Sequence, residues 1–226
     1  MHSSTDPRVV RCLDGLSMSF LMLDQIHREL HPTCVSIKTD KRNLARAFWL
    51  CWSFVDTVHR IREVAQASPG LSKKAPEVRL FLDATSIAEK FRHYIQHLRS
   101  ELSKSPGNLF PVWGSLSWVD DEDSQLTYIA LAGAQLGNIS YSGCVFDTHN
   151  RDWVSKVALS VDDLSFNFDL IFEYCVEFRD FVMSVLVSTY SPGITFQEDL
   201  PIITMRVIMG DSTEPEQQSA DDAKHS

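Results

Sequence analysis

The sequence lacks any long run of apolar residues. Its longest run, residues 48–55, is already interrupted by Ser53, whereas a helix that spans a membrane needs about 20 predominantly apolar residues. The first residues, MHSSTDPRVVRCLDG, also lack the apolar centre of a secretory signal peptide. We therefore expect a soluble, cytoplasmic protein that does not enter a membrane.

Cysteine is scarce and carries no recognisable pattern. There are five cysteines, and no two of them are spaced as C-x-x-C. An odd number without that spacing argues against a disulfide framework and against a zinc site of four thiolates. The chain also contains no G-x-S-x-G, G-x-x-x-x-G-K or G-x-G-x-x-G motif. This excludes the usual signatures of serine hydrolases, phosphate-binding loops and dinucleotide-binding folds.

Charge is present but unevenly distributed. The formal net charge of the 226 residues is −9. Residues 41–104 carry twelve basic and six acidic side chains, a net charge of +6, whereas residues 105–226 have a net charge of −14. A basic block can contact phosphate groups. The alternative is that it pairs with the acidic C-terminal half, within the fold or across a dimer.

Apolar residues recur every three or four positions in four segments, which is typical of a helix with one buried face. These segments are about residues 8–31, 41–67, 76–104 and 163–189. We expect Pro32 to end the first helix and Pro76 to lie in the first turn of the third. Four amphipathic helices are enough to form the core of a helical bundle.

The pattern changes between the third and fourth helices, over about residues 111–161. Short segments rich in β-branched and aromatic residues are separated there by Gly, Asn and Asp clusters, at 111–119, 126–132, 139–146 and 153–161. This pattern predicts a small antiparallel sheet of three or four strands. The expected fold class is therefore α+β, a four-helix bundle with a small antiparallel β-sheet inserted between the third and fourth long helices.

The length of the chain is that of one domain, and we assign residues 1–210 to it. Residues 201–208, PIITMRVI, read as one further strand. Residues 211–226 contain no large apolar side chain, so we expect a disordered acidic tail.

One motif contains side chains that could take part in catalysis. Arg92, His93 and His97 lie late in the third predicted helix, in the run FRHYIQH. Four residues separate Arg92 from His97, and the first of them, His93, is polar. This pattern resembles the signature of the HEPN superfamily of four-helix bundles, an arginine followed by a polar residue and, a few positions later, by a histidine. The resemblance covers about residues 8–104 and 162–189, and the β insertion departs from the simplest family pattern.

The resemblance implies a metal-independent endoribonuclease of a toxin–antitoxin or defence system. It would use neither metal nor cofactor, act on RNA, have an antitoxin as a possible partner and form a homodimer. Other family members keep the fold without activity, so the alternative is a non-catalytic helical dimerisation or interaction module. Apolar residues on more than one face of the fourth helix, among them Phe172, Phe178, Phe181 and Met183, also favour a homodimer.

The residue types suit this chemistry. Attack by a 2′-hydroxyl on the RNA phosphate needs a base for that hydroxyl and an acid for the leaving oxygen, and an ordinary histidine titrates near neutral pH. His97 would act as the acid or base, and Arg92 would hold the phosphate oxygens. His93 would orient the backbone or share the proton transfer.

Helical geometry leaves alternatives open for these three residues. Arg92 and His97 are roughly 140° apart around a helix, so a shared site needs a second protomer or the second helix, where Asp56, His59 and Glu63 form a polar face. Arg92 could instead form an ordinary salt bridge. His93 and His97 could be solvated or could bind zinc, although no third ligand is obvious.

Two further groups of residues have alternative interpretations. His27 and His31 are also four residues apart, but His27 lies in an apolar stripe, which favours a core or interface position over a metal site. Trp113 and Trp118 could form an aromatic platform for bases, whereas strand tryptophans are more often packed in a core. A third class of function, a small-ligand binder, would need an apolar pocket beside these two tryptophans.

Overall fold

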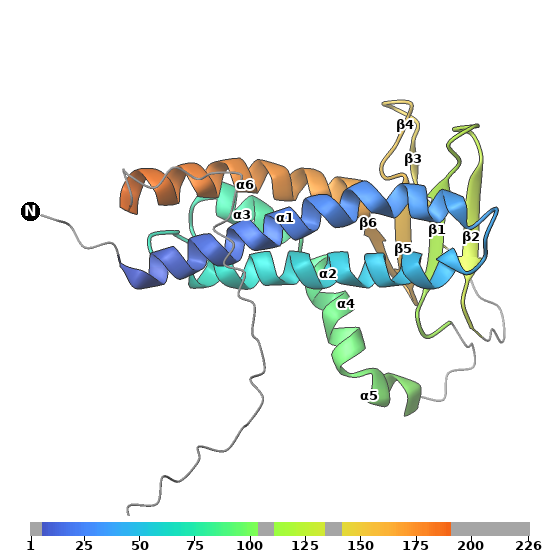
Figure 1. Cartoon of the computed structure of the whole chain (residues 1–226), viewed down its shortest axis with the longest axis horizontal. Helices are drawn as coiled ribbons and strands as arrows, with labels where there is room; N and C mark the ends of the chain where they lie inside the picture. Colours follow the sequence, from blue (N-terminus) through green and yellow to red (C-terminus); the bar gives the residue numbers. More distant parts are fainter. Residues whose placement is uncertain (1–5, 104–110, 134–141, 191–226) are drawn as a thin grey trace, which may run out of the picture.

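Two long antiparallel helices, α1 (Pro7–Ser36) and α2 (Asn43–Ala67), form the centre of the fold in the computed structural model, which describes residues 6–103, 111–133 and 142–190 (Figure 1). Helix α6 (Phe168–Tyr190) lies along α1, and the short α3 (Pro76–Ala84) packs against α6. Helix α4 (Ile87–Gln96) packs on α2 and leads into α5 (Leu98–Ser103). In Figure 1, α4 and α5 project away from the long helices.

A four-stranded antiparallel sheet lies where α1 ends and α2 begins (Figure 1). Its strands are β1 (Ser115–Val119), β2 (Thr127–Leu131), β5 (Val157–Val161) and β6 (Leu164–Asn167), in the order β2-β1-β5-β6. Strands β3 (Phe146–Asp147) and β4 (Asp152–Trp153) form a separate small hairpin. The prediction of an α+β fold with a small antiparallel sheet ahead of the last long helix is confirmed.

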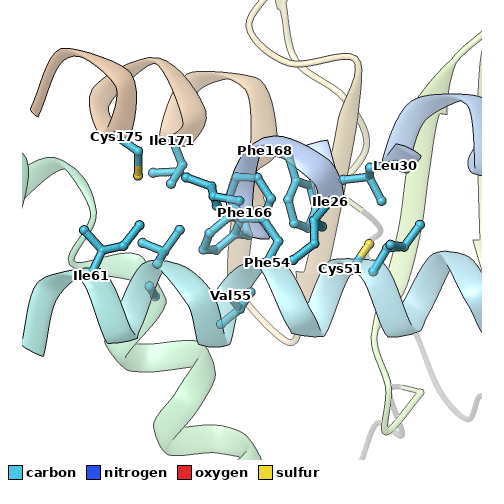
Figure 2. Packing of buried hydrophobic residues seen from close by; sticks show 14 of the residues in the cluster. Ile26, Leu30, Cys51, Phe54, Val55, Ile61, Phe166, Phe168, Ile171 and Cys175 are labelled. Carbon is cyan, nitrogen blue, oxygen red and sulfur yellow. The ribbon is translucent and has the colours of Figure 1, made fainter. Parts of the chain in front are cut away.

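The sheet and the helices share one hydrophobic core, which Figure 2 shows from close by. Phe54 of α2 packs edge-to-face against Phe168 at the start of α6, with ring centroids 5.1 Å apart, and also contacts Phe166 of β6. Phe91 of α4 packs against Phe166 at 5.5 Å. Because all four rings are buried, this cluster fixes α4 against the sheet and the long helices.

The expected end of the first helix at Pro32 is wrong. Helix α1 continues through Pro32 to Ser36. Proline removes one helical hydrogen bond, but the last turn is held by the burial of Cys34 and Ile37 in the core. His31 adds a hydrogen bond from Nε2 to the carbonyl oxygen of Val119 at 2.8 Å, which joins this turn to β1.

The third predicted helix, 76–104, is also wrong as a single element, because it is broken twice. Helix α3 ends before Thr85, and α4 ends before His97. The first break coincides with Arg62 of α2, whose Nη1 donates to the carbonyl oxygen of Leu82 at 2.5 Å and to Thr85 Oγ1 at 2.6 Å. A cation at the C-terminal end of a helix satisfies its free carbonyl groups and favours termination there.

The last long helix begins later than the predicted residue 163. Residues 164–167 form strand β6, and Asp162 has a positive φ of 51° in the turn between β5 and β6, so neither it nor Asp163 caps a helix. The second helix, predicted at 41–67, is confirmed as α2. Of the predicted strand 139–146, residues 139–141 lie outside the described residues, residues 142–145 form no strand, and only Phe146 belongs to a strand, β3, so this prediction is largely wrong. The predicted strand 201–208 and the tail 211–226 lie outside the described residues.

Among the described segments, none of the helices combines the length and the apolar character that crossing a membrane requires.

Candidate functional site

Arg92 extends from α4 toward α2 and forms an ion pair with Asp56 through Nη1 and Oδ1. The other carboxylate oxygen of Asp56 accepts a hydrogen bond from Arg60 Nε at 2.7 Å. The Arg92 side chain is 31% exposed, and Asp56 is its only ion-pair or hydrogen-bond partner within the described ranges. Its Nε is buried and has no acceptor there. The predicted phosphate-binding guanidinium is therefore accessible, but it is already paired with a carboxylate.

His93 and His97 lie together at the exposed C-terminal end of α4. Their ring centroids are 4.3 Å apart and the ring planes are inclined by 45°. His97 follows the last residue of α4, and its backbone N–H donates to the carbonyl oxygen of His93 at 3.0 Å. The contact places two exposed imidazole side chains side by side.

His93 also borders a cleft of about 530 Å³ between α4, α5 and the β5–β6 turn. The cleft is acidic, because Glu89, Glu101, Asp162 and Asp163 all line it, opposed by Lys90 and His93. Tyr94 lies at its inner side, where burial, followed by the nearby acids Asp162 and Glu101, raises its pKa to about 12. Phosphate is disfavoured in this cleft, so an anionic ligand would approach the histidines from outside it.

A polar network fixes the position of α4 on α2. Arg62 is only 7% exposed and donates from Nε to Glu89 Oε1 at 2.9 Å, in addition to its bonds at the end of α3. His59 Nδ1 lies 3.4 Å from the same oxygen. Burial acts to raise the pKa of Glu89, but the hydrogen bond and charge of Arg62, with His59 beside it, outweigh burial and lower it. The buried Arg62 thus keeps the partly exposed carboxylate of Glu89 charged, one turn away from Arg92.

His59, Glu63 and Glu89 are the group of described residues that could hold a metal ion, since their ligand atoms lie within 4.8 Å of one another. Glu89 Oε1 is already shared by Arg62 and His59. A divalent cation there would lie beside the Arg62 guanidinium, and this repulsion opposes binding. The absence of a metal remains a prediction for this site.

The structure therefore divides the three predicted residues between two contacts. Arg92 pairs with Asp56 on α2, whereas His97 pairs with His93 on its own helix. Asp56 and His59, which the sequence placed on a polar face of the second helix, do lie at this interface. No contact joins Arg92 to His97 among the described residues, so a site that uses both would be completed by a ligand or a second chain.

Sequence reasoning missed the carboxylate–histidine pair formed by Asp169 and His27. Asp169 Oδ1 lies 2.7 Å from His27 Nε2, and the His27 ring stacks on Phe172 with centroids 3.8 Å apart. The pair borders a cleft of about 520 Å³ whose described lining residues include no serine, threonine or cysteine. Because the partners are 142 positions apart in the sequence, no local pattern could have revealed the pair. The pair joins α1 to the first turn of α6.

Comparison with protein-family models, with curated proteins and with solved structures found no match to this chain.

Proposed function

We propose that this chain is a HEPN-like protein, in which α1, α2, α6 and the broken third helical segment α3–α4 form the family bundle and the C-terminal end of α4 binds and cleaves RNA without a metal. The contact between His93 and His97 carries this proposal. Two exposed imidazoles 4.3 Å apart, one helical turn from an accessible arginine, supply the groups that phosphodiester cleavage requires.

In the proposed reaction, the 2′-oxygen of a ribose attacks the adjacent phosphorus, and the bond from phosphorus to the 5′-oxygen breaks. One imidazole accepts the proton of the 2′-hydroxyl, and an imidazolium donates a proton to the leaving 5′-oxygen. The products are a 2′,3′-cyclic phosphate and a 5′-hydroxyl end. Arg92 would exchange its contact with Asp56 for the phosphate oxygens, whose charge grows in the transition state.

A second copy of the chain would bring Arg92 and His97 to one phosphate. The side chains that suggested a homodimer from sequence, Phe172, Phe181 and Met183, are half-buried against their own core. Exposed apolar side chains occur instead on α1, where Met18, Leu21 and Met22 lie on one face. A symmetric dimer places the same surface of both copies together, so a shared site requires the two-fold axis to lie beside α4, and the α1 face is the surface we assign to a dimer without a shared site.

The test is cleavage of single-stranded RNA by purified protein and its variants. We expect His97→Ala to abolish cleavage, while His149→Ala, which removes an exposed histidine of the β3–β4 hairpin, leaves the rate unchanged. We expect Arg92→Ala to abolish cleavage, while Arg60→Ala removes the other arginine on Asp56 without this loss. A chelator should have no effect.

Mixing the two inactive variants separates a composite site from a site within one chain. If Arg92 of one copy serves His97 of the other, a heterodimer of Arg92→Ala and His97→Ala contains one intact site and regains activity. No cleavage by the wild-type protein, or cleavage that survives His97→Ala, would overturn the proposal.

A non-catalytic dimerisation or interaction module is the second candidate, and the ion pair between Arg92 and Asp56 favours it. In this case Arg92 serves to hold α4 on α2, and the acidic cleft beside His93 keeps RNA away. We then expect a dimer in solution that dissociates when Met18 and Met22 are replaced by Gln, and no RNA cleavage. An antitoxin-like partner remains a prediction for either candidate.

A further inference from the structure

A cavity of about 590 Å³ opens beside the N-terminal part of α2, where Figure 1 shows that helix beginning next to β1 and β2. Its walls are mainly aromatic, with Phe48, Trp49 and Trp52 from α2 and Trp113 from the residues that precede β1. The volume is in the range of cavities that enclose a small molecule. Neither Arg92 nor the two histidines of α4 line it.

Two of these tryptophans expose much of their surface. Trp49 is 63% exposed and Trp113 is 49% exposed, whereas Trp118, on the following strand, is buried. Trp113 packs edge-to-face on Trp52 with centroids 6.4 Å apart, which fixes the ring position. Large aromatic side chains exposed together around a hollow are typical of a binding site rather than of ordinary surface.

Trp52 carries an unused hydrogen-bond donor at this place. Its Nε1 is buried and has no partner among the described residues, in contrast to Trp153 Nε1, which donates to the carbonyl oxygen of Ser124 at 2.7 Å. Trp118 Nε1 also lacks a partner, but that ring lies in the core and does not line the cavity. A buried donor without an acceptor is costly, but no described contact places this atom at the surface of the cavity, so it sets no requirement on an occupant.

The rim of the cavity is cationic. Lys41 and Arg42 both line it. Arg42 is bound by Asp40, with Nε 3.0 Å and Nη2 2.8 Å from the carboxylate oxygens, so its charge is offset. Lys41 is exposed and forms no ion pair with a described residue. The uncompensated charge at the rim is therefore positive, and it attracts an anion and repels a cation.

We propose that this cavity binds a small planar aromatic molecule that carries an anionic group. The aromatic ring lies among Trp49, Trp52 and Trp113, and the anion faces Lys41. This binding does not depend on RNA cleavage at α4, because the two sites share no lining residue.

The test uses two probes of the same size and opposite charge, 2-naphthoate and 2-naphthylmethylammonium, titrated into the full chain by calorimetry. We expect the anion to bind at least tenfold more tightly than the cation. Trp49→Ala should lower the affinity for 2-naphthoate by roughly tenfold, since stacking on one aromatic ring contributes about that much to binding. Trp113→Ala should do the same.

Lys41→Gln should lower the affinity for the anionic probe several-fold and leave the affinity for the cationic probe unchanged or higher. The difference in affinity between the two probes should therefore become smaller. Lys74→Gln, at an exposed position outside the cavity, is the matched control and should change neither affinity. Thermal unfolding monitors folding of each variant, and exposed Trp49 can be replaced without loss of core packing. Equal affinity for both probes, no binding at millimolar concentration, or binding unchanged by Trp49→Ala would overturn the proposal.

Discussion

Arg92 and Asp56 join α4 to α2 through one ion pair at the edge of the protein, with both side chains about one third exposed. The same two residues decide between the two candidate functions. A catalytic Arg92 must leave Asp56 easily when a phosphate arrives, whereas a structural Arg92 must not.

A double-mutant cycle measures this difference. Partly exposed ion pairs contribute little because water screens them, so we expect a coupling free energy below about 1 kcal/mol between Arg92→Ala and Asp56→Ala. Urea unfolding of the two single variants and the double variant gives the value. A coupling of several kcal/mol would contradict the expectation and favour the structural role of Arg92.

Arg62 should be far more important for stability than its neighbour Arg60. Its guanidinium is buried and donates hydrogen bonds to Glu89, to the carbonyl oxygen of Leu82 and to Thr85. We expect Arg62→Met to lower the free energy of unfolding by about 1–3 kcal/mol, because the Leu82 carbonyl and the buried Thr85 hydroxyl lose a hydrogen-bond donor and Glu89 loses its cation. Chemical denaturation measures the loss.

Arg60→Met is the matched control on the same helix. Arg60 is exposed and, among the described residues, pairs only with Asp56, so the change in unfolding free energy should stay within about 0.5 kcal/mol. Equal losses in the two variants would show that Arg62 does not hold the break between α3 and α4.

Asp169 should make the stability of the protein depend on pH. Burial acts to raise the pKa of its carboxyl, but the hydrogen bonds from His27, the Lys156 N–H and Ser155 together lower it below its ordinary value. A lowered carboxyl pKa stabilises the folded state above the unfolded pKa of about 3.9, and this contribution is lost as the pH falls through the folded pKa.

The wild type should therefore have a higher free energy of unfolding than Asp169→Asn, with the largest difference at pH 6–7 and a smaller difference below about pH 4. Denaturant unfolding at a series of pH values measures it. Asp180→Asn, at an exposed position of the same helix, serves as the control. A difference that grows toward low pH would have the wrong sign and would refute this role of the His27–Asp169 pair.

Gly114 holds a place that no other residue fits without strain. Its φ is +92°, and a Cβ atom there would lie 2.5 Å from the carbonyl oxygen of Ser160 in the adjacent strand. We expect Gly114→Ala to destabilise the protein by about 1–3 kcal/mol, as measured by urea unfolding.

Gly15→Ala is the opposite case. A Cβ there meets Val64 at an ordinary 3.5 Å inside α1, and alanine is favoured over glycine within a helix by about 0.5–1 kcal/mol. The two substitutions should therefore shift stability in opposite directions. Destabilisation by Gly15→Ala and none by Gly114→Ala would contradict both arguments.

Local patterns predicted what depends on neighbouring residues. The apolar spacing of α2 identified the helix to within two residues of its ends, because a 3.6-residue period reflects one buried face. The four-residue spacing of His93 and His97 placed their rings on the same side of one helix. The segments rich in β-branched and aromatic residues at 111–119 and 153–161 contain β1 and β5, the two central strands of the sheet.

Contacts between distant parts of the chain decided the rest. Whether the apolar stripe of residues 76–104 forms one helix depends on Arg62, which reaches the end of α3 from another helix. Trp113 and Trp118 occur in one short motif, yet Trp113 lies exposed at a cavity beside Trp52 of α2, whereas Trp118 is buried in the core and stacks on Tyr128 of β2. The sequence by itself determined which residues could form helices and strands and which two histidines could lie side by side on one helix. Tertiary structure alone decided which charges meet and which aromatic rings remain accessible, because these depend on atoms far apart along the chain.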